Sequence, residues 1–225
     1  MSLLPQGALA YVAPYAAFLA LAEAGARWPD LEVALFPLRV IAPAALLGWF
    51  WSKGAYAELR GYPLGRGTAA DVAAGLAVAA LWLGPYLLWP ALPRGEPFDP
   101  ALYGDARRPL AFGLRLLGFA LVTPLVEELF VRSFLVRFAE RFERGDFRDE
   151  PIARFALRGF VVSVLWFGFS HAAWEWWVAF PAGLAFNAWL YTRGSLMPCV
   201  VAHAAANAAI WAVVVGFPGS LDAFL

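Results

Sequence analysis

The chain has few of the residues that usually build disulfides and metal sites. Its 225 residues include one cysteine and two histidines, and only 15% are Asp, Glu, Lys or Arg. A single cysteine cannot form an intramolecular disulfide or a cysteine-rich metal site, and the apolar neighbours of Cys199 favour a buried packing thiol. The formal net charge is zero, so the charge balance gives no reason to expect a nucleic-acid partner.

Apolar residues dominate the composition. They make up 62% of the chain, with 11 tryptophans and a mean hydropathy of +0.63, which is typical of polytopic membrane proteins. Apolar runs that suggest membrane helices lie near 7–22, 34–52, 70–90, 110–139, 157–173, 177–192 and 196–216. We therefore predict an all-α transmembrane bundle of about seven to eight helices. It would form a single integral membrane domain over 1–225, with N-terminal helices in 1–109 and a core in 110–216.

The fourth apolar run is too long for one straight crossing of the membrane. Thr123 and Pro124 lie within it, and a threonine followed by proline is typical of a helix start, with Thr as N-cap and Pro in the first turn. We therefore expect a helix to restart at Thr123, which would place Glu127 and Glu128 in its second turn, below the membrane surface.

The distribution of basic residues predicts the orientation. Two connections are rich in them: Lys53, Arg60 and Arg66 in the first, and Arg137, Arg141, Arg144, Arg148, Arg154 and Arg158 in the second. The connections that alternate with these hold fewer basic residues. The first has Arg27, the next has Arg94, Arg107 and Arg108, and the last has none. The positive-inside rule places 53–69 and 137–158 in the cytoplasm, and seven spans would put the N-terminal end inside and the C-terminal end outside.

Two adjacent carboxylates, Glu127 and Glu128, lie in an apolar stretch that also contains Arg132. On a helix, Glu128 and Arg132 are at positions i and i+4 and can form an ion pair, whereas Glu127 points about 100° away. This suggests one carboxylate held for structure and one available as a base. The alternative is that both acids only neutralise arginines near a helix end, Arg137 included.

Both histidines also lie on apolar segments. His203 and Asn207 share one helix face at i and i+4, so an imidazole and a carboxamide could act together as hydrogen-bond donors to a developing oxyanion. The alternative for this pair is hydrogen bonding between helices. His171 follows an apolar run, and taken alone it would usually be a structural histidine. Ionisable groups at membrane depth generally face a cavity or a partner, so we predict that these segments meet at one site.

Three spaced patterns occur in order along the chain: Glu127-Glu128-x-x-x-Arg132, Phe167-x-x-x-His171 and His203-x-x-x-Asn207. Together they resemble the CAAX protease and bacteriocin-processing family, also called the type II CAAX endopeptidase family. The stretch from Tyr191 to Pro198 resembles that family's lead-in to the third motif, with Arg193 as an inserted residue. The resemblance covers roughly residues 110–215.

The resemblance implies an intramembrane endopeptidase that acts on a membrane-associated protein or peptide. By position, Glu127 and His171 would activate a water, His203 and Asn207 would stabilise the oxyanion, and Glu128, Arg132 and Phe167 would support them. The resemblance leaves both a metal-free glutamate mechanism and a zinc mechanism open, because Glu127, His171 and His203 could together supply the three protein ligands of a catalytic zinc site. We expect an integral protein of the bacterial cytoplasmic membrane, embedded in lipid and without a nucleic-acid partner.

Other classes of function use similar residues. A non-catalytic membrane scaffold, or a bacteriocin self-immunity protein, could bind a partner through the same polar cavity. A proton-coupled transporter could relay protons through intramembrane Glu and His. The two halves of the chain show no repeated pair of Gly- or Pro-broken segments, which disfavours an inverted-repeat transporter.

Overall fold

The computed structural model describes residues 7–96, 99–142, 145–217 and 221–224. These residues form helices and connections, with no strand among them, as the sequence predicted. In chain order the helices are α1 (Leu9–Arg27), α2 (Glu32–Ser52), α3 (Arg66–Leu88), α4 (Arg108–Leu117), α5 (Thr123–Glu127), α6 (Val136–Arg141), α7 (Leu157–Phe169), α8 (Trp176–Arg193) and α9 (Leu196–Gly216).

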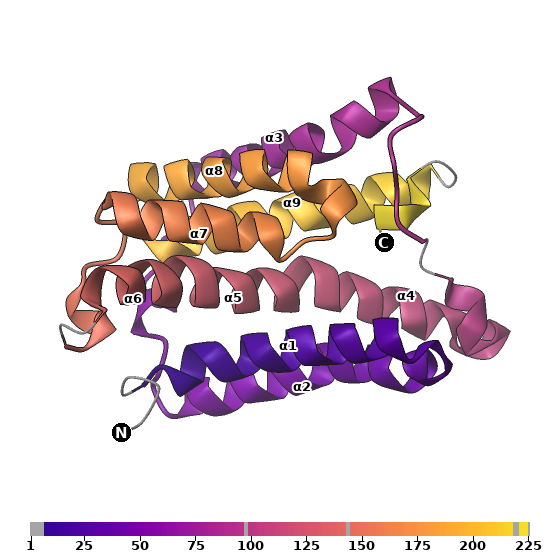
Figure 1. Cartoon of the computed structure of the whole chain (residues 1–225), viewed down its shortest axis with the longest axis horizontal. Coiled ribbons are helices and arrows are strands. Elements are labelled where there is room, and N and C mark those ends of the chain that lie inside the picture. Colours follow the sequence, from indigo (N-terminus) through magenta and orange to yellow (C-terminus); the bar gives the residue numbers. More distant parts are fainter. Residues whose placement is uncertain (1–6, 97–98, 143–144, 218–220, 225) are drawn as a thin grey trace.

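The helices run roughly parallel to one long axis, in layers (Figure 1). The hairpin of α1 and α2 forms one outer layer, and α4, α5 and α6 follow one another as a single long rod in the middle. The helices α3, α7, α8 and α9 form the other side, where α3 packs closely on α9 and α7 on α8. The first turn of α1 and the last turn of α9 lie at opposite ends of this bundle.

Five helical segments are long and apolar enough to cross a membrane by length and composition: Leu9–Arg27, Pro29–Ser52, Arg66–Leu88, Asp105–Arg141 and Leu196–Gly216. The helix α7 has only 13 residues, about 20 Å at 1.5 Å per residue, and falls short of a hydrocarbon core of about 30 Å. The helix α8 has 18 residues, but Asn187, Arg193 and its tryptophans lower its hydropathy. The protein is an integral membrane protein with five candidate spans; the expected number of seven to eight is not confirmed.

The middle rod corrects the prediction of a helix restart at Thr123. Thr123, the predicted N-cap, itself has helical dihedral angles (φ −59°, ψ −50°), so the helix does not start there. The backbone instead widens into π-helical turns at Gly118–Val122 and again at Glu128–Leu135. A proline removes one N–H and clashes with the preceding turn of an α-helix. The π-helical turn just before Pro124 gives the ring room, so the helix continues without interruption.

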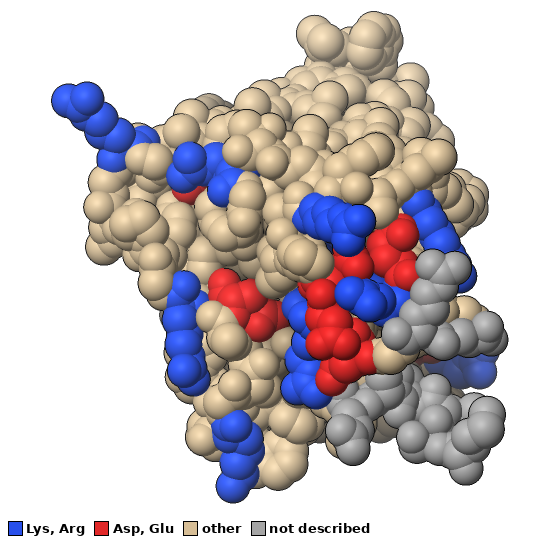
Figure 2. Space-filling view, turned by 90° about the vertical axis from the view of Figure 1, so that its left-hand side faces the viewer, with Lys and Arg blue, Asp and Glu red and all other residues tan. Residues whose placement is uncertain are grey.

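The two basic connections predicted to be cytoplasmic do lie at the same end of the bundle, beside the first turn of α1 (Figure 1). Figure 2, which faces this end, shows acidic and basic side chains gathered over it. Largely buried carboxylates hold the elements together there: Glu58 accepts from Tyr11 and Arg137, and Asp71 accepts from Arg193 and from Tyr62 and Trp189. Arg144 of the predicted basic set lies outside the described residues.

The contact between α3 and α9 requires a glycine. A Cβ atom built on Gly75 would lie 2.1 Å from the carbonyl oxygen of Ala202, the residue before His203. That neighbour is backbone and cannot move aside without shifting α9. Small residues at such positions allow helix backbones to approach closely in membranes. Gly75 therefore sets the position of the helix that carries His203 and Asn207.

We predict that Gly75→Ala lowers the free energy of unfolding by about 1–3 kcal/mol, because the added methyl group overpacks a backbone contact. The matched control is Gly84→Ala in the same helix, where a Cβ atom meets nothing within 4 Å. This control should be neutral or slightly stabilising, because alanine is the better helix former. Thermal unfolding in detergent, followed by tryptophan fluorescence, measures both; equal midpoints for the two variants would contradict the prediction.

Candidate active site

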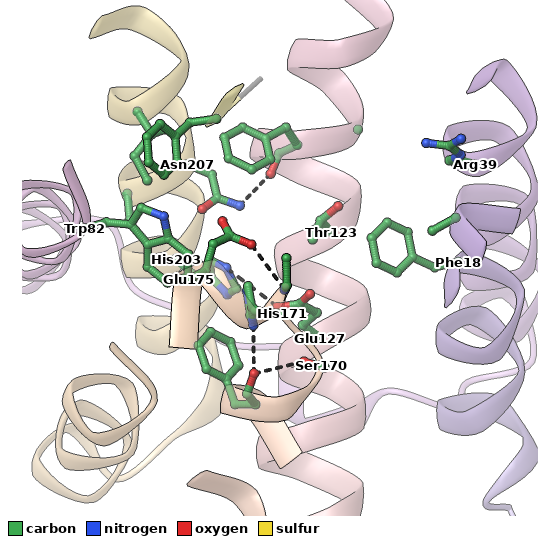
Figure 3. A pocket seen from close by; sticks show the side chains of 18 of the residues that line it. Phe18, Arg39, Trp82, Thr123, Glu127, Ser170, His171, Glu175, His203 and Asn207 are labelled. Carbon is green, nitrogen blue, oxygen red and sulfur yellow. Dashed lines mark hydrogen bonds and ion pairs between the residues drawn. The ribbon is translucent and has the colours of Figure 1, made fainter. Parts of the chain in front are cut away.

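A cavity of about 360 Å³ lies between the α1–α2 hairpin, the middle rod, α7 and α9. The polar residues singled out from the three motifs line it together: Glu127 at the end of α5, His171 just after α7, and His203 and Asn207 on α9. Figure 3 shows these side chains converging from separate elements. Most of the remaining wall is apolar and aromatic, for example Phe18, Val40 and Trp82. The structure thus brings the predicted residues to one place.

The two neighbouring glutamates differ in their surroundings, as the helix geometry predicted. Glu128 is fully buried, and its Oε1 accepts a hydrogen bond from Arg132 Nη1 at 2.9 Å. Glu127 lines the cavity, and its buried Oε2 accepts no hydrogen bond from any described residue. Arg137 pairs with Glu58 rather than with either of these acids. The alternative that both glutamates simply neutralise nearby arginines therefore holds for Glu128 alone.

Arg132 connects three elements in the interior. Its guanidinium lies over the ring of Phe167, 4.3 Å from the ring centre, and its Nε donates to Asn187 Oδ1 at 3.3 Å. Asn187 in turn donates to Ser163 Oγ at 2.7 Å, so α7 and α8 are both tied to the middle rod. Asn187 belongs to none of the three motifs and was not predicted. A fully buried amide in an otherwise apolar helix was the signal that could have found it, because polar side chains at membrane depth usually bond to another helix.

The surroundings of His203 define its tautomer. Its Nδ1 lies 2.9 Å from Glu128 Oε1, the same oxygen that accepts from Arg132. An ionised carboxylate only accepts hydrogen bonds, so Nδ1 carries the proton. The second nitrogen, Nε2, lies 3.9 Å from Glu127 Oε2, beyond hydrogen-bond distance. Neutral His203 therefore presents a lone pair at Nε2, and it can donate from that atom only as the imidazolium.

His171 is oriented in a comparable way. The helix α7 ends at Phe169, so His171 lies just past its end, where its Nδ1 is 2.7 Å from the carbonyl oxygen of Phe167. A carbonyl oxygen accepts, so this Nδ1 is also the protonated nitrogen and Nε2 is the acceptor of the neutral ring. The ring packs against Phe167 and Trp82, with centre-to-centre distances of 4.7 and 5.2 Å.

Asn207 shares the cavity with His203 but has a structural partner as well. Its Nδ2 donates to the carbonyl oxygen of Phe119 at 2.8 Å (Figure 3). In a π-helix the N–H of each residue bonds to the carbonyl oxygen five residues earlier, as Thr123 N–H does to the carbonyl of Gly118. By the same pattern, the donor to the carbonyl of Phe119 would be the N–H of residue 124. Residue 124 is proline and has no N–H. Asn207 thus satisfies the carbonyl that Pro124 leaves without a donor, and one N–H of its amide remains for another acceptor.

A further acid at the cavity, Glu175, lies in the connection between α7 and α8. Its carboxylate accepts from the N–H of Ala172 at 3.3 Å and points toward the cavity (Figure 3). Burial raises the pKa of Glu175, while the neighbouring His171 acts in the opposite direction. The sequence analysis did not single out this residue, because it belongs to none of the three motifs.

The donor atoms suggested for zinc are chemically suitable, because two imidazoles and a carboxylate are common zinc ligands. Their placement is less so. Within the described ranges, no group of three or more His, Cys, Asp or Glu side chains is close enough to hold a metal ion. The residues as placed do not fit a three-ligand site, so we derive no chemical step through a metal.

Comparison with known proteins gives one family. The family model described as "Type II CAAX prenyl endopeptidase Rce1-like" matches residues 109–209, which include all three motifs. Neither the curated proteins nor the solved structures yield a match to this chain. The resemblance predicted for roughly residues 110–215 is therefore confirmed: residues 109–209 of this membrane protein match the model of the Rce1-like type II CAAX prenyl endopeptidase family.

Proposed function

We propose that the protein is an intramembrane endopeptidase that hydrolyses a peptide bond in a membrane-associated protein or peptide. The observation that carries this proposal is the contrast between adjacent acids. Glu128 is bonded to both Arg132 and His203, whereas Glu127 presents a carboxylate oxygen, without a hydrogen-bond partner among the described residues, to a cavity that also holds two imidazoles. The match of residues 109–209 to the model of an endopeptidase family supports the same conclusion.

In this proposal Glu127 is the general base. It accepts a proton from a water molecule in the cavity as the water attacks the carbonyl carbon of the substrate, and His171 Nε2 accepts the water's second hydrogen bond. When the tetrahedral intermediate collapses, Glu127 returns its proton to the leaving amine. The hydrogen bond from His171 Nδ1 to Phe167 supports this role, because it leaves Nε2 as an acceptor.

The developing oxyanion lies, in this proposal, beside His203 and Asn207. The remaining N–H of Asn207 is a donor in any protonation state. His203 can donate from Nε2 only when it is an imidazolium, whose positive charge is balanced by the adjacent Glu128 carboxylate. Donors placed where charge develops are worth about 2.7–4 kcal/mol of barrier each, so both should matter for turnover.

We predict that Glu127→Gln and Glu128→Gln fail in different ways. Loss of the base in Glu127→Gln should lower turnover by about two orders of magnitude or more while thermal stability is retained. Glu128→Gln should lower the free energy of unfolding by roughly 3 kcal/mol, because Arg132 loses its buried counter-charge. The assay follows cleavage of a panel of membrane-anchored peptides by mass spectrometry, beside thermal unfolding.

Glu23→Gln is the matched control, since that side chain is 71% exposed on the surface of α1. It should change neither quantity. Activity in Glu127→Gln equal to the parent would rule out Glu127 as the base.

We predict that His203→Gln keeps part of the turnover, because glutamine retains a side-chain N–H donor for the developing oxyanion. His203→Ala removes that donor and should lose more of the turnover than His203→Gln. Cleavage of the same membrane-anchored peptides measures both variants, and equal loss in the two would rule out a donor role for His203.

We predict that turnover does not require zinc, because the three candidate ligands are not placed as a metal-binding group. Purified protein should lack stoichiometric zinc by elemental analysis and should keep its activity after exhaustive chelation. If chelation abolished turnover and added zinc restored it, the metal-free assignment would be overturned. In that case His171→Gln and His203→Gln should each also reduce zinc content.

A further inference from the structure

The cavity extends from the candidate catalytic residues toward one end of the bundle only. Along the middle rod, the residues that line it run from Arg115 to Glu127, and none of the lining residues lies between Glu127 and the end of α6. On α9 they run from His203 toward the C-terminal end of the helix, as far as Ile210. Both directions lead to the same end, because the rod and α9 are antiparallel (Figure 1).

The hairpin and the remaining wall show the same asymmetry. The lining residues of α1, Phe18 to Ala22, lie in its C-terminal half, and those of α2, Phe36 to Val40, lie in its N-terminal half. These two halves adjoin the turn of the hairpin. The connection from His171 to Glu175 lies at the same end and contributes lining residues there. These walls of the cavity therefore lead away from the end where α1 begins and α2 finishes.

The two ends of the bundle differ in basic residues. The end away from the cavity carries Lys53, Arg60, Arg66, Arg137, Arg141, Arg148, Arg154, Arg158 and Arg193 among the described residues. The end toward which the cavity extends has fewer in its connections and at the adjoining helix ends: Arg27, Arg94, Arg107 and Arg108. Short connections rich in Lys and Arg stay on the cytoplasmic side of a membrane. The cavity end is therefore the non-cytoplasmic end.

Exposed tryptophans support the view that both ends lie at membrane surfaces. Trp49 and Trp51 are about half exposed near the basic end, and Trp28 and Trp89 are about half exposed near the cavity end. Tryptophan is enriched at both membrane–water interfaces. The long axis of the bundle then follows the membrane normal, and the two ends face different compartments.

We propose that the cavity is reached from the non-cytoplasmic face, so that its substrate is a membrane-anchored polypeptide segment presented on that face rather than a cytoplasmic chain. The substrate part of this inference rests on the proposed endopeptidase function, whereas the side of access does not. Largely apolar and aromatic walls suit an extended apolar segment, whose peptide groups would meet Glu127 at the inner end of the cavity.

Single cysteines test the side of access without any need for catalysis. Ala57→Cys and Ala101→Cys form a matched pair, because both alanines are exposed in 3₁₀ turns at opposite ends of the bundle. Ala22→Cys reports on the cavity wall. The native Cys199 is fully buried, so the parent chain is the unlabelled control. A membrane-impermeant maleimide is added to sealed cells, then again after the membrane is opened.

We expect labelling of Ala101→Cys and Ala22→Cys from outside, and of Ala57→Cys only after the membrane is opened. The reverse pattern would overturn the proposal. The proposal would also be overturned if Ala101→Cys were labelled from outside but Ala22→Cys were not. In that case the orientation would be as expected, but the cavity would be closed to that face.

The substrate is tested with one cleavable segment attached to either side of a single membrane anchor. Cleavage of the outer segment alone supports the proposal, and cleavage of the inner segment alone overturns it. If labelling follows the expected pattern and neither segment is cleaved by the parent, the endopeptidase function fails while the side of access stands. Glu127→Gln is the inactive control for both segments.

Discussion

A single buried carboxylate oxygen organises the interior of this protein. Glu128 Oε1 accepts from Arg132 on the middle rod and from His203 on α9. Arg132 then reaches Asn187 on α8 and stacks on Phe167 of α7. Burying an ion pair costs several kcal/mol per ion in desolvation, which only good geometry and further hydrogen bonds offset. This arrangement joins four elements of the bundle, so the helices that bear the motifs are held together by the supporting residues Glu128 and Arg132 acting with His203.

The backbone of the middle rod contributes to the same site through Pro124. The π-helical turns on either side of α5 allow the rod to continue past a proline, and they leave the carbonyl of Phe119 to be satisfied by Asn207. Asn207, which by resemblance would bind an oxyanion, therefore also donates a hydrogen bond to a backbone carbonyl of the helix that carries the candidate base Glu127. Loss of Asn207 should for this reason affect both structure and turnover, and its effect alone cannot separate the two roles.

Much of this arrangement could be predicted from the sequence, because apolar runs and motif spacing depend on local periodicity. The runs predicted near 34–52 and 196–216 agree closely with α2 and α9, and the pairing of Glu128 with Arg132 follows from helical spacing alone. The continuity of the rod at Pro124 was not predicted, because π-helical widening depends on how neighbouring helices pack. Glu175 was missed because it is brought to the cavity only by the fold of a short connection, which periodicity does not describe.

The hydrogen bonds that orient the two imidazoles also determine which protonation states can do chemistry. Both rings donate from Nδ1, to Phe167 and to Glu128, so each offers Nε2 as a lone pair when neutral. His171 then suits the acceptor role beside Glu127, while His203 needs an additional proton to serve as a donor. With Glu127 and Glu128 ionised, Arg132 charged and His203 protonated, this inner cluster carries no net charge. Uncompensated charge is strongly disfavoured in a bilayer interior, so the protonation state that the proposed reaction requires is also the one whose charges balance.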